Sequence, residues 1–217
     1  MKSLALFAVL LLCHSLAAHS VWIEPDAGGR LVVRFAEPDG KLEKSPGHLD
    51  ELTLPRAWQA GASNAPMALT VEKQRDHFAL GHVTASAAVQ IETEFQVIAA
   101  PGRPGRRPHF YARWHPAGAG AAAPALTLDL VPTGQAGEVR VVFRGKPLGG
   151  VRATLRPPDG KEQELTADGE GFLRFASPQA GQHLLSVAHH RETLGGFAGG
   201  RAYDLTSHNA ALTWRQP

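Results

Sequence analysis

The sequence predicts an all-β protein in which two β-sandwich units follow a cleaved signal peptide. Short runs of apolar or alternating residues recur along the chain, separated by turn sequences rich in glycine, proline and aspartate. This is the pattern of β-strands joined by tight turns, and it accounts for nearly all of the regular structure that we expect. Removing residues 1–18 from the 217-residue chain leaves 199, which are sufficient for one large or two small β domains.

The first 18 residues have the three parts of a secretory signal. Lys2 supplies the positive start, residues 4–12 form an apolar run, and Ala17 and Ala18 precede the expected cut. The apolar run is too short to anchor the chain in a bilayer, and no later segment is long and apolar enough to cross one. We therefore expect a periplasmic or secreted protein whose mature chain has no stable membrane insertion.

The position of the cut decides which residue begins the mature chain. A cut after Ala18 leaves His19 first, whereas a cut after Ala17 leaves Ala18 first; Leu16, at the third position before the first of these cuts, is larger than usual. Cys13 lacks the small preceding residue of a lipoprotein signal. Because it is the only cysteine, the mature protein has no disulfide and no thiolate ligand and must be held by its core.

The N-terminal unit, residues 19–131, is expected to open with a hairpin. Residues 21–23 and 31–35 are strand-like runs, and the turn residues 26–29 separate them. His19 then stands at the head of a strand, which gives a metal chelate a fixed backbone. Further elements are expected as strands at 68–72, 77–80, 89–98 and 110–114, one helical turn within 44–52 capped by Ser45 or Asp50, and a surface loop at 117–124.

The C-terminal unit, residues 132–217, shows the strand spacing of a β-sandwich, with Asp-Gly turns at 159–160 and 168–169. A stretch rich in glycine and polar residues, 189–209, is long enough to be a functional loop. The strands are expected at 138–143, 151–155, 164–166, 172–175, 183–188 and 210–214.

An N-terminal His19 offers two nitrogen ligands to one metal ion. The α-amine has a pKa of about 8 and the imidazole a pKa of about 6.5, so both can donate a lone pair at neutral pH. One more imidazole would complete a histidine brace, a three-nitrogen site that suits copper in particular. Since the mature chain has no cysteine, its many histidines favour copper, nickel, cobalt or zinc over calcium or magnesium.

The partners of His19 must come from distant segments, because no spaced ligand motif is present. His189 is favoured first, since it ends an expected strand, and its neighbour His190 would point to the opposite face. His48 lies in a turn, and His208 leads into the closing strand. The predicted metal ligands are His19, His48, His189 and His208, with Glu24 and Asp50 as carboxylates that could orient an imidazole.

Several stretches resemble a family of exported bacterial proteins, namely residues 128–132, 142–148, 166–171 and 185–189, together with the opening at 19–25. This is the NikM-like family, often labelled as the periplasmic component of nickel or cobalt uptake. The resemblance covers most of the mature chain. It implies immunoglobulin- or transthyretin-like sandwiches with a carboxypeptidase-regulatory-like second unit, a histidine ligand at His189, and a role in handling divalent transition metals. The chain departs from the family pattern at residues 45–49, where a Tyr-Gly-His-Pro-Phe type segment is usual.

The charge of the chain predicts no strong field that would attract nucleic acid or an anionic membrane. The formal charge of +2 becomes about +1 when Lys2 is removed with the signal, so no strong field surrounds the protein. The one basic run, Arg103, Arg106 and Arg107, lies among prolines and is expected to be a solvated loop.

The predicted function is a periplasmic carrier or accessory for nickel, cobalt or copper uptake that works with a membrane metal transporter. An enzyme is not expected, because the chain has no nucleophile elbow and no phosphate loop. Two alternatives remain open. The sandwiches could form a metal-free binding module of the cell envelope, or the histidine brace could make the protein a copper oxidoreductase.

Overall fold

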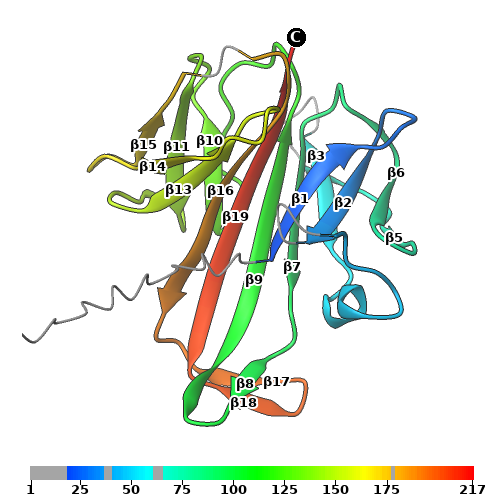
Figure 1. Ribbon diagram of the computed structural model, residues 1–217, viewed down its shortest axis with the longest axis vertical. Helices are drawn as coiled ribbons and strands as arrows, with labels where there is room; N and C mark the ends of the chain where they lie inside the picture. Colours follow the sequence, from blue (N-terminus) through cyan, green and yellow to red (C-terminus); the bar gives the residue numbers. More distant parts are fainter. Residues whose placement is uncertain (1–18, 37–40, 61–65, 177–178) are drawn as a thin grey trace, which may run out of the picture.

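A computed structural model describes residues 19–36, 41–60, 66–176 and 179–217, and its regular structure is almost entirely β (Figure 1). The all-β prediction is therefore confirmed. Helical structure in these ranges is limited to a 3₁₀ turn at His48–Glu51, inside the segment where the sequence predicts one helical turn. None of the described segments forms a helix with the length and apolar character needed to cross a bilayer.

A nine-stranded sheet runs through the middle of the molecule. Its long strands β9 (Arg103–His115), β16 (Gly181–Glu192) and β19 (Leu205–Gln216) lie side by side, with β19 in the centre, antiparallel to β16 and parallel to β9. The strands of this central sheet are β3 (Arg56–Ala60), β4 (Pro66–Ala68), β7 (Val89–Glu94), β8 (Ile98–Ala100), β9 (Arg103–His115), β13 (Arg152–Arg156), β14 (Gln163–Thr166), β16 (Gly181–Glu192) and β19 (Leu205–Gln216).

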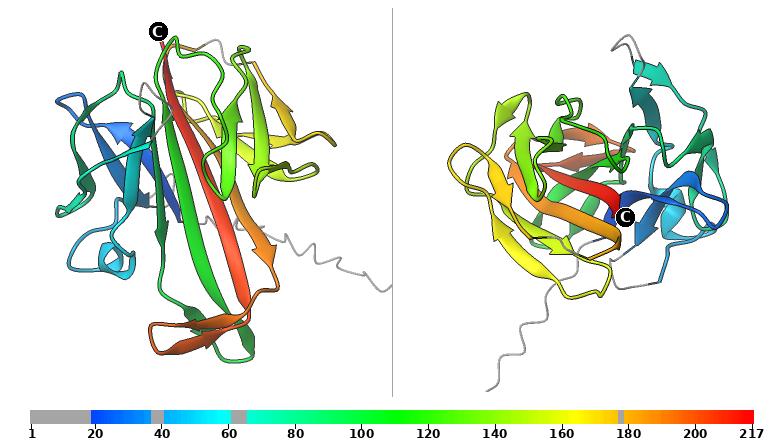
Figure 2. Two further views of the ribbon diagram at one scale, coloured as in Figure 1. Left: turned by 180° about the vertical axis from the view of Figure 1, so that it is seen from behind. Right: turned by 90° about the horizontal axis from the view of Figure 1, so that it is seen from above.

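Two smaller sheets pack against opposite faces of the central sheet (Figure 2). Alternation along β9 shows this directly, because Phe110 and Trp114 enter the core beneath one small sheet and Tyr111 enters the core beneath the other. The first small sheet contains β1 (Ser20–Pro25), β2 (Arg30–Ala36), β5 (Glu72–Lys73) and β6 (Phe78–Thr84); the second contains β10 (Leu128–Pro132), β11 (Glu138–Phe143), β12 (Lys146–Pro147) and β15 (Phe172–Arg174).

The protein is thus a pair of β-sandwiches that share one central sheet. The division expected between residues 131 and 132 falls inside β10, all five residues of which pair with β11. Moreover, β9 from the first half of the chain pairs with β19 from the second half over ten residues. Main-chain hydrogen bonds therefore join the two sandwiches directly.

Two predicted loops contain strands instead. Arg103, Arg106 and Arg107 belong to the first part of β9, because pairing with β8 and β19 outweighs the local effect of the neighbouring prolines. The stretch 189–209 holds the end of β16, a hairpin of β17 (Gly196–Ala198) and β18 (Arg201–Tyr203), and the start of β19. The predicted loop at residues 117–124 does lack regular structure.

A buried ion pair crosses from the central sheet to the second small sheet. Arg113 of β9 donates from Nε to Asp129 Oδ1 at 3.0 Å and from a terminal nitrogen to Oδ2 at 2.6 Å. The two side chains are 3% and 0% exposed. Asp129 Oδ2 also accepts the backbone N–H of Ala125 at 2.8 Å, so the carboxylate holds the chain that enters β10. Both charges are compensated within the interior, as buried charges must be.

Candidate metal site

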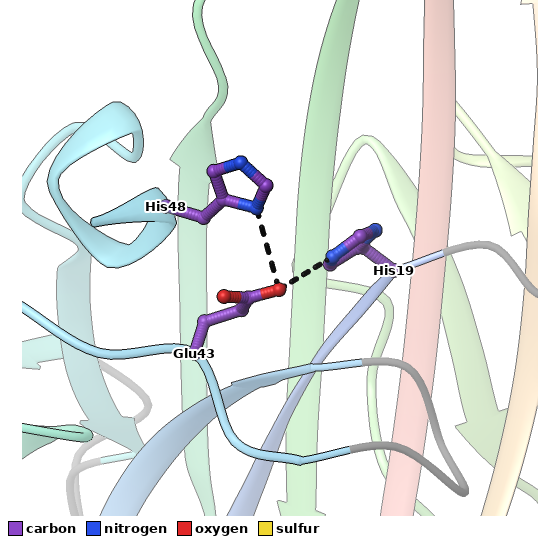
Figure 3. A group of neighbouring side chains, drawn as sticks. All are labelled: His19, Glu43 and His48. Carbon is purple, nitrogen blue, oxygen red and sulfur yellow. Dashed lines mark hydrogen bonds and ion pairs between the residues drawn. The ribbon is translucent and has the colours of Figure 1, made fainter.

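His19, Glu43 and His48 come together beside the first sandwich (Figure 3). His19 directly precedes β1, and its ring centroid lies 5.1 Å from that of Phe35 on β2. Its Nε2 lies 2.8 Å from Glu43 Oε1. His48 begins the 3₁₀ turn and points its Nδ1 at the same carboxylate oxygen, 3.4 Å away. The two imidazole centroids are 6.0 Å apart.

The backbone of Glu43 is fixed by β2, although the residue lies beyond the strand. Its N–H donates to the carbonyl oxygen of Phe35 at 2.9 Å, so the chain returns to the strand that carries the aromatic neighbour of His19. Glu43 therefore faces His19 from a constrained position. Glu43 is not among the ligands predicted from the sequence, because one glutamate in a polar segment carries no local signal that distinguishes a ligand from a solvated side chain.

The turn that carries His48 depends on a glycine and a carboxylate. Gly47 has φ of 146°, and a Cβ there would lie 2.9 Å from the carbonyl oxygen of Lys44, so a larger residue would force the turn to move. Asp50 accepts hydrogen bonds from Lys73 Nζ at 2.5 Å, Ser45 Oγ at 2.9 Å and the Gly47 N–H at 3.1 Å. Lys73, then Ser45 and Gly47, hold the pKa of the Asp50 carboxyl below its usual range. Asp50 thus braces the turn and touches neither imidazole.

The three ligand atoms, one from each residue, all lie within 4.8 Å of one another. Two imidazoles with one carboxylate form a donor set for nickel, cobalt, copper or zinc, whereas calcium and magnesium prefer oxygen ligands throughout. The side chains are 35%, 24% and 57% exposed for His19, Glu43 and His48, so an ion could reach them from solvent. In the described ranges, no other three residues of the types histidine, cysteine, aspartate and glutamate have ligand atoms this close together.

A histidine brace would use other atoms of His19. Its Nε2 faces Glu43, whereas chelation together with the α-amine of the same residue uses Nδ1. In the 217-residue chain the nitrogen of His19 is a peptide nitrogen. A brace would therefore require cleavage after Ala18, while the arrangement with Glu43 and His48 does not.

His189 and His208, the other two predicted ligands, are not members of the group that contains His19. Arg106 donates a hydrogen bond to His189 Nδ1 at 2.8 Å, and the His189 backbone lies at a bulge with φ of 58°. The pKa of His189 is lowered by burial and by the charges of Arg106 and Arg191. Arg106 thus engages the Nδ1 of His189.

His208 faces the second sandwich, on the other side of the central sheet from His19. It stacks on Tyr111, with ring centroids 5.9 Å apart, and its Nδ1 lies 3.0 Å from the tyrosine hydroxyl. Its Nε2 lies 2.9 Å from Glu192 Oε2. Burial raises the pKa of Tyr111 to about 12, so the phenol stays protonated in this network. His208 is thus a buried member of a hydrogen-bonded cluster, and both of its ring nitrogens have partners.

The histidines around His208 should make the protein less stable in mild acid. His190 and His109 pair with His208 across neighbouring strands, and burial is the main cause that lowers the pKa of all three. Below a pH of about 6.5 the unfolded chain takes up protons that the folded protein resists, so the free energy of unfolding falls with falling pH. Above that pH the free energy of unfolding keeps its full value. The urea midpoint is therefore expected to be lower at pH 5.5 than at pH 7.5.

The variant His208→Gln should show a smaller decrease between these two pH values, because it lacks one of the buried imidazoles. His82→Gln, at an exposed position of β6, is the matched control and should behave as the parent protein does. An equal decrease in both variants would show that the buried cluster is not responsible for the acid sensitivity.

Glu24, predicted to orient an imidazole, has other partners. Its carboxylate accepts the indole N–H of Trp22 at 2.8 Å and Arg34 Nε at 2.9 Å. It therefore ties β1 to β2 and takes no part in the histidine group.

No known protein-family model matches the chain, and no curated protein matches it in sequence.

Proposed function

We propose that the exported protein binds one divalent transition metal ion, nickel, cobalt or copper, through His19, Glu43 and His48, and acts as a carrier or accessory for metal uptake. The observation that carries this proposal is the convergence of three ligand atoms from three separate segments within 4.8 Å. A membrane metal transporter would be the partner that receives or supplies the ion.

The distances within the group support a shared ion. Ligands that bind one metal at about 2.0–2.2 Å lie roughly 3 Å or slightly more from each other. The contacts of Glu43 Oε1 with His19 Nε2 and His48 Nδ1, 2.8 and 3.4 Å, are close to this spacing. A small shift of the side chains would admit an ion without a change in the strands.

The exposure of the group supports transfer rather than permanent retention. Three protein ligands leave coordination positions open to water or to a ligand from a partner. His48 is more than half exposed, at 57%, and lies on a short turn, so it could be the first ligand to release the ion. A resident structural ion would instead be enclosed by four protein ligands.

Native mass spectrometry of the protein recovered from the periplasm tests the proposal. We expect a chain that begins at His19 and retains one equivalent of cobalt, nickel or copper after removal of excess metal. The variant His19→Ala should lose the ion, since it removes one of the two imidazoles. A protein that remains empty after exposure to each metal would overturn the proposal and favour a metal-free module of the cell envelope.

The same spectra distinguish a histidine brace from a site formed by Glu43 and the two imidazoles. Copper bound only when the chain begins at His19, and lost when one residue precedes it, would place the α-amine in the site. Retention by both forms would show that Glu43 and the two imidazoles are sufficient.

A further inference from the structure

One end of the molecule, opposite the C-terminus, is formed by β8, the start of β9 and the hairpin of β17 and β18 (Figure 1). The hairpin is held firmly against β9. Asp204 N–H donates to the Gly105 carbonyl oxygen at 2.9 Å, and Gly105 N–H donates to Asp204 Oδ2 at 3.0 Å. A Cβ at position 105 would lie 2.9 Å from the Ala202 carbonyl oxygen, so this close approach requires glycine. The hairpin is therefore a fixed projection.

Large apolar side chains are exposed at this end. Phe197 of β17 is 73% exposed, Leu194 just before β17 is 54% exposed, and Ile98 of β8 is 40% exposed. Among the described residues only Leu54 and Met67 are comparable, and they lie elsewhere on the chain. Such a concentration of apolar surface on a projecting hairpin indicates an interaction site.

Two exposed arginines belong to the same end of the molecule. Arg103 at the start of β9 and Arg201 in β18 are exposed, and neither forms an ion pair within the described part of the chain. Of the nearby carboxylates, Glu94 is paired with Arg107 and Glu192 with Arg144, while Asp204 accepts the Gly105 N–H. Residues 94–107 and 189–209 together hold five arginines and three carboxylates, so this end carries a positive balance although the net charge of the whole protein is small.

We propose that this end, which we term the basic tip (Ile98, Arg103, Leu194, Phe197 and Arg201), docks peripherally on an anionic phospholipid surface. The tip is a projection rather than a groove, so it fits a deformable layer into which an aromatic and two aliphatic side chains can partition. The guanidinium groups would meet the lipid phosphates at the depth of the headgroups, where amphipathic and basic side chains are favoured. The contact is peripheral, since only a few apolar side chains are available to enter the layer.

Vesicle sedimentation with the purified exported protein tests this docking. We expect binding to vesicles that contain phosphatidylglycerol, weaker binding to pure phosphatidylcholine, and loss of the difference at high salt. Arg103→Gln combined with Arg201→Gln should reduce partitioning onto the anionic vesicles by about tenfold or more, because each arginine contributes to attraction by the surface. Arg152→Gln, at an exposed arginine of β13 on another part of the molecule, is the matched control.

A dye at position 197 reports insertion of the tip independently. The chain has a single native cysteine, Cys13 in the expected signal, so Phe197→Cys introduces the only cysteine of the mature protein. An environment-sensitive fluorophore attached there should brighten on anionic vesicles, while the same dye at Leu54→Cys should not. Absence of binding to anionic vesicles, or equal binding by the arginine double variant, would overturn the proposal and indicate a protein partner for the tip.

Discussion

Replacing His48 with alanine is expected to weaken cobalt or nickel binding by at least about a hundredfold, since the loss of even a supporting group outside the ligands costs about 10–100-fold. His48 supplies one of only two imidazoles in the group with Glu43. Competition with a chromophoric chelator would measure the change. The fold should be retained, because the His48 side chain is 57% exposed and the turn is held by Asp50.

His82→Ala is the control for this measurement, because His82 is an exposed histidine on β6. It should bind metal as the parent protein does. Unchanged affinity in His48→Ala would refute the assignment of this imidazole. Loss of binding in His189→Ala instead would move the site to the bulge of β16.

Removing the carboxylate of Asp129 should cost about 3–5 kcal/mol of unfolding free energy, the usual result of leaving one partner of a buried ion pair uncompensated. The variant Asp129→Ala leaves the guanidinium of Arg113, whose side chain is only 3% exposed, without its counter-ion. It also removes the acceptor for the Ala125 N–H. Since small domains are stable by about 5–15 kcal/mol, urea denaturation should show a large loss or complete unfolding.

Two further variants test whether the loss of stability comes from a buried charge that is left without its partner. Glu92→Ala breaks a pair with Arg56, which is 79% exposed, and should change stability by about 1 kcal/mol or less. The double variant Arg113→Met with Asp129→Leu leaves no buried charge and should be more stable than Asp129→Ala alone. An Asp129→Ala protein as stable as Glu92→Ala would show that the buried pair does not hold the second small sheet to the central sheet.

Strands could be predicted from the sequence where the signal lies within a few neighbouring residues. The alternation in β11 and the turn before β2 both depend on neighbouring residues, and both are present in the structure. The pairing of β9 with β19 could not be inferred in the same way. Leu205 lies opposite Arg106, and a parallel contact between residues so far apart leaves no trace in either sequence segment. The sequence therefore predicts two units without revealing that β9 and β19 pair in one sheet.

Only the part of the candidate site that neighbouring residues mark could be predicted from the sequence. His19 and His48 stand out because one follows the expected signal sequence and the other lies in a turn that contains proline and glycine. His189 is the favoured partner in the sequence because it ends an expected strand, and alternation would turn its neighbour His190 to the opposite face. The bulge between Val187 and His190 breaks that alternation. A bulge is set by the partner strand, so a single segment does not reveal it. Glu43 became recognisable only when the fold placed its carboxylate between the two imidazoles.

The strand that comes last in the sequence, β19, occupies the centre of the central sheet, between β16 and β9. The shared layer of both sandwiches is therefore incomplete until residues 205–216 are available. Contacts between residues distant in sequence slow folding, and a chain growing from its N-terminus would hold one edge of β9 without its hydrogen-bonding partner until β19 is made. Pairing of β19 is then the step that completes both sandwiches together. In an exported chain, as proposed above, this delay would keep the chain unfolded until it has crossed the membrane.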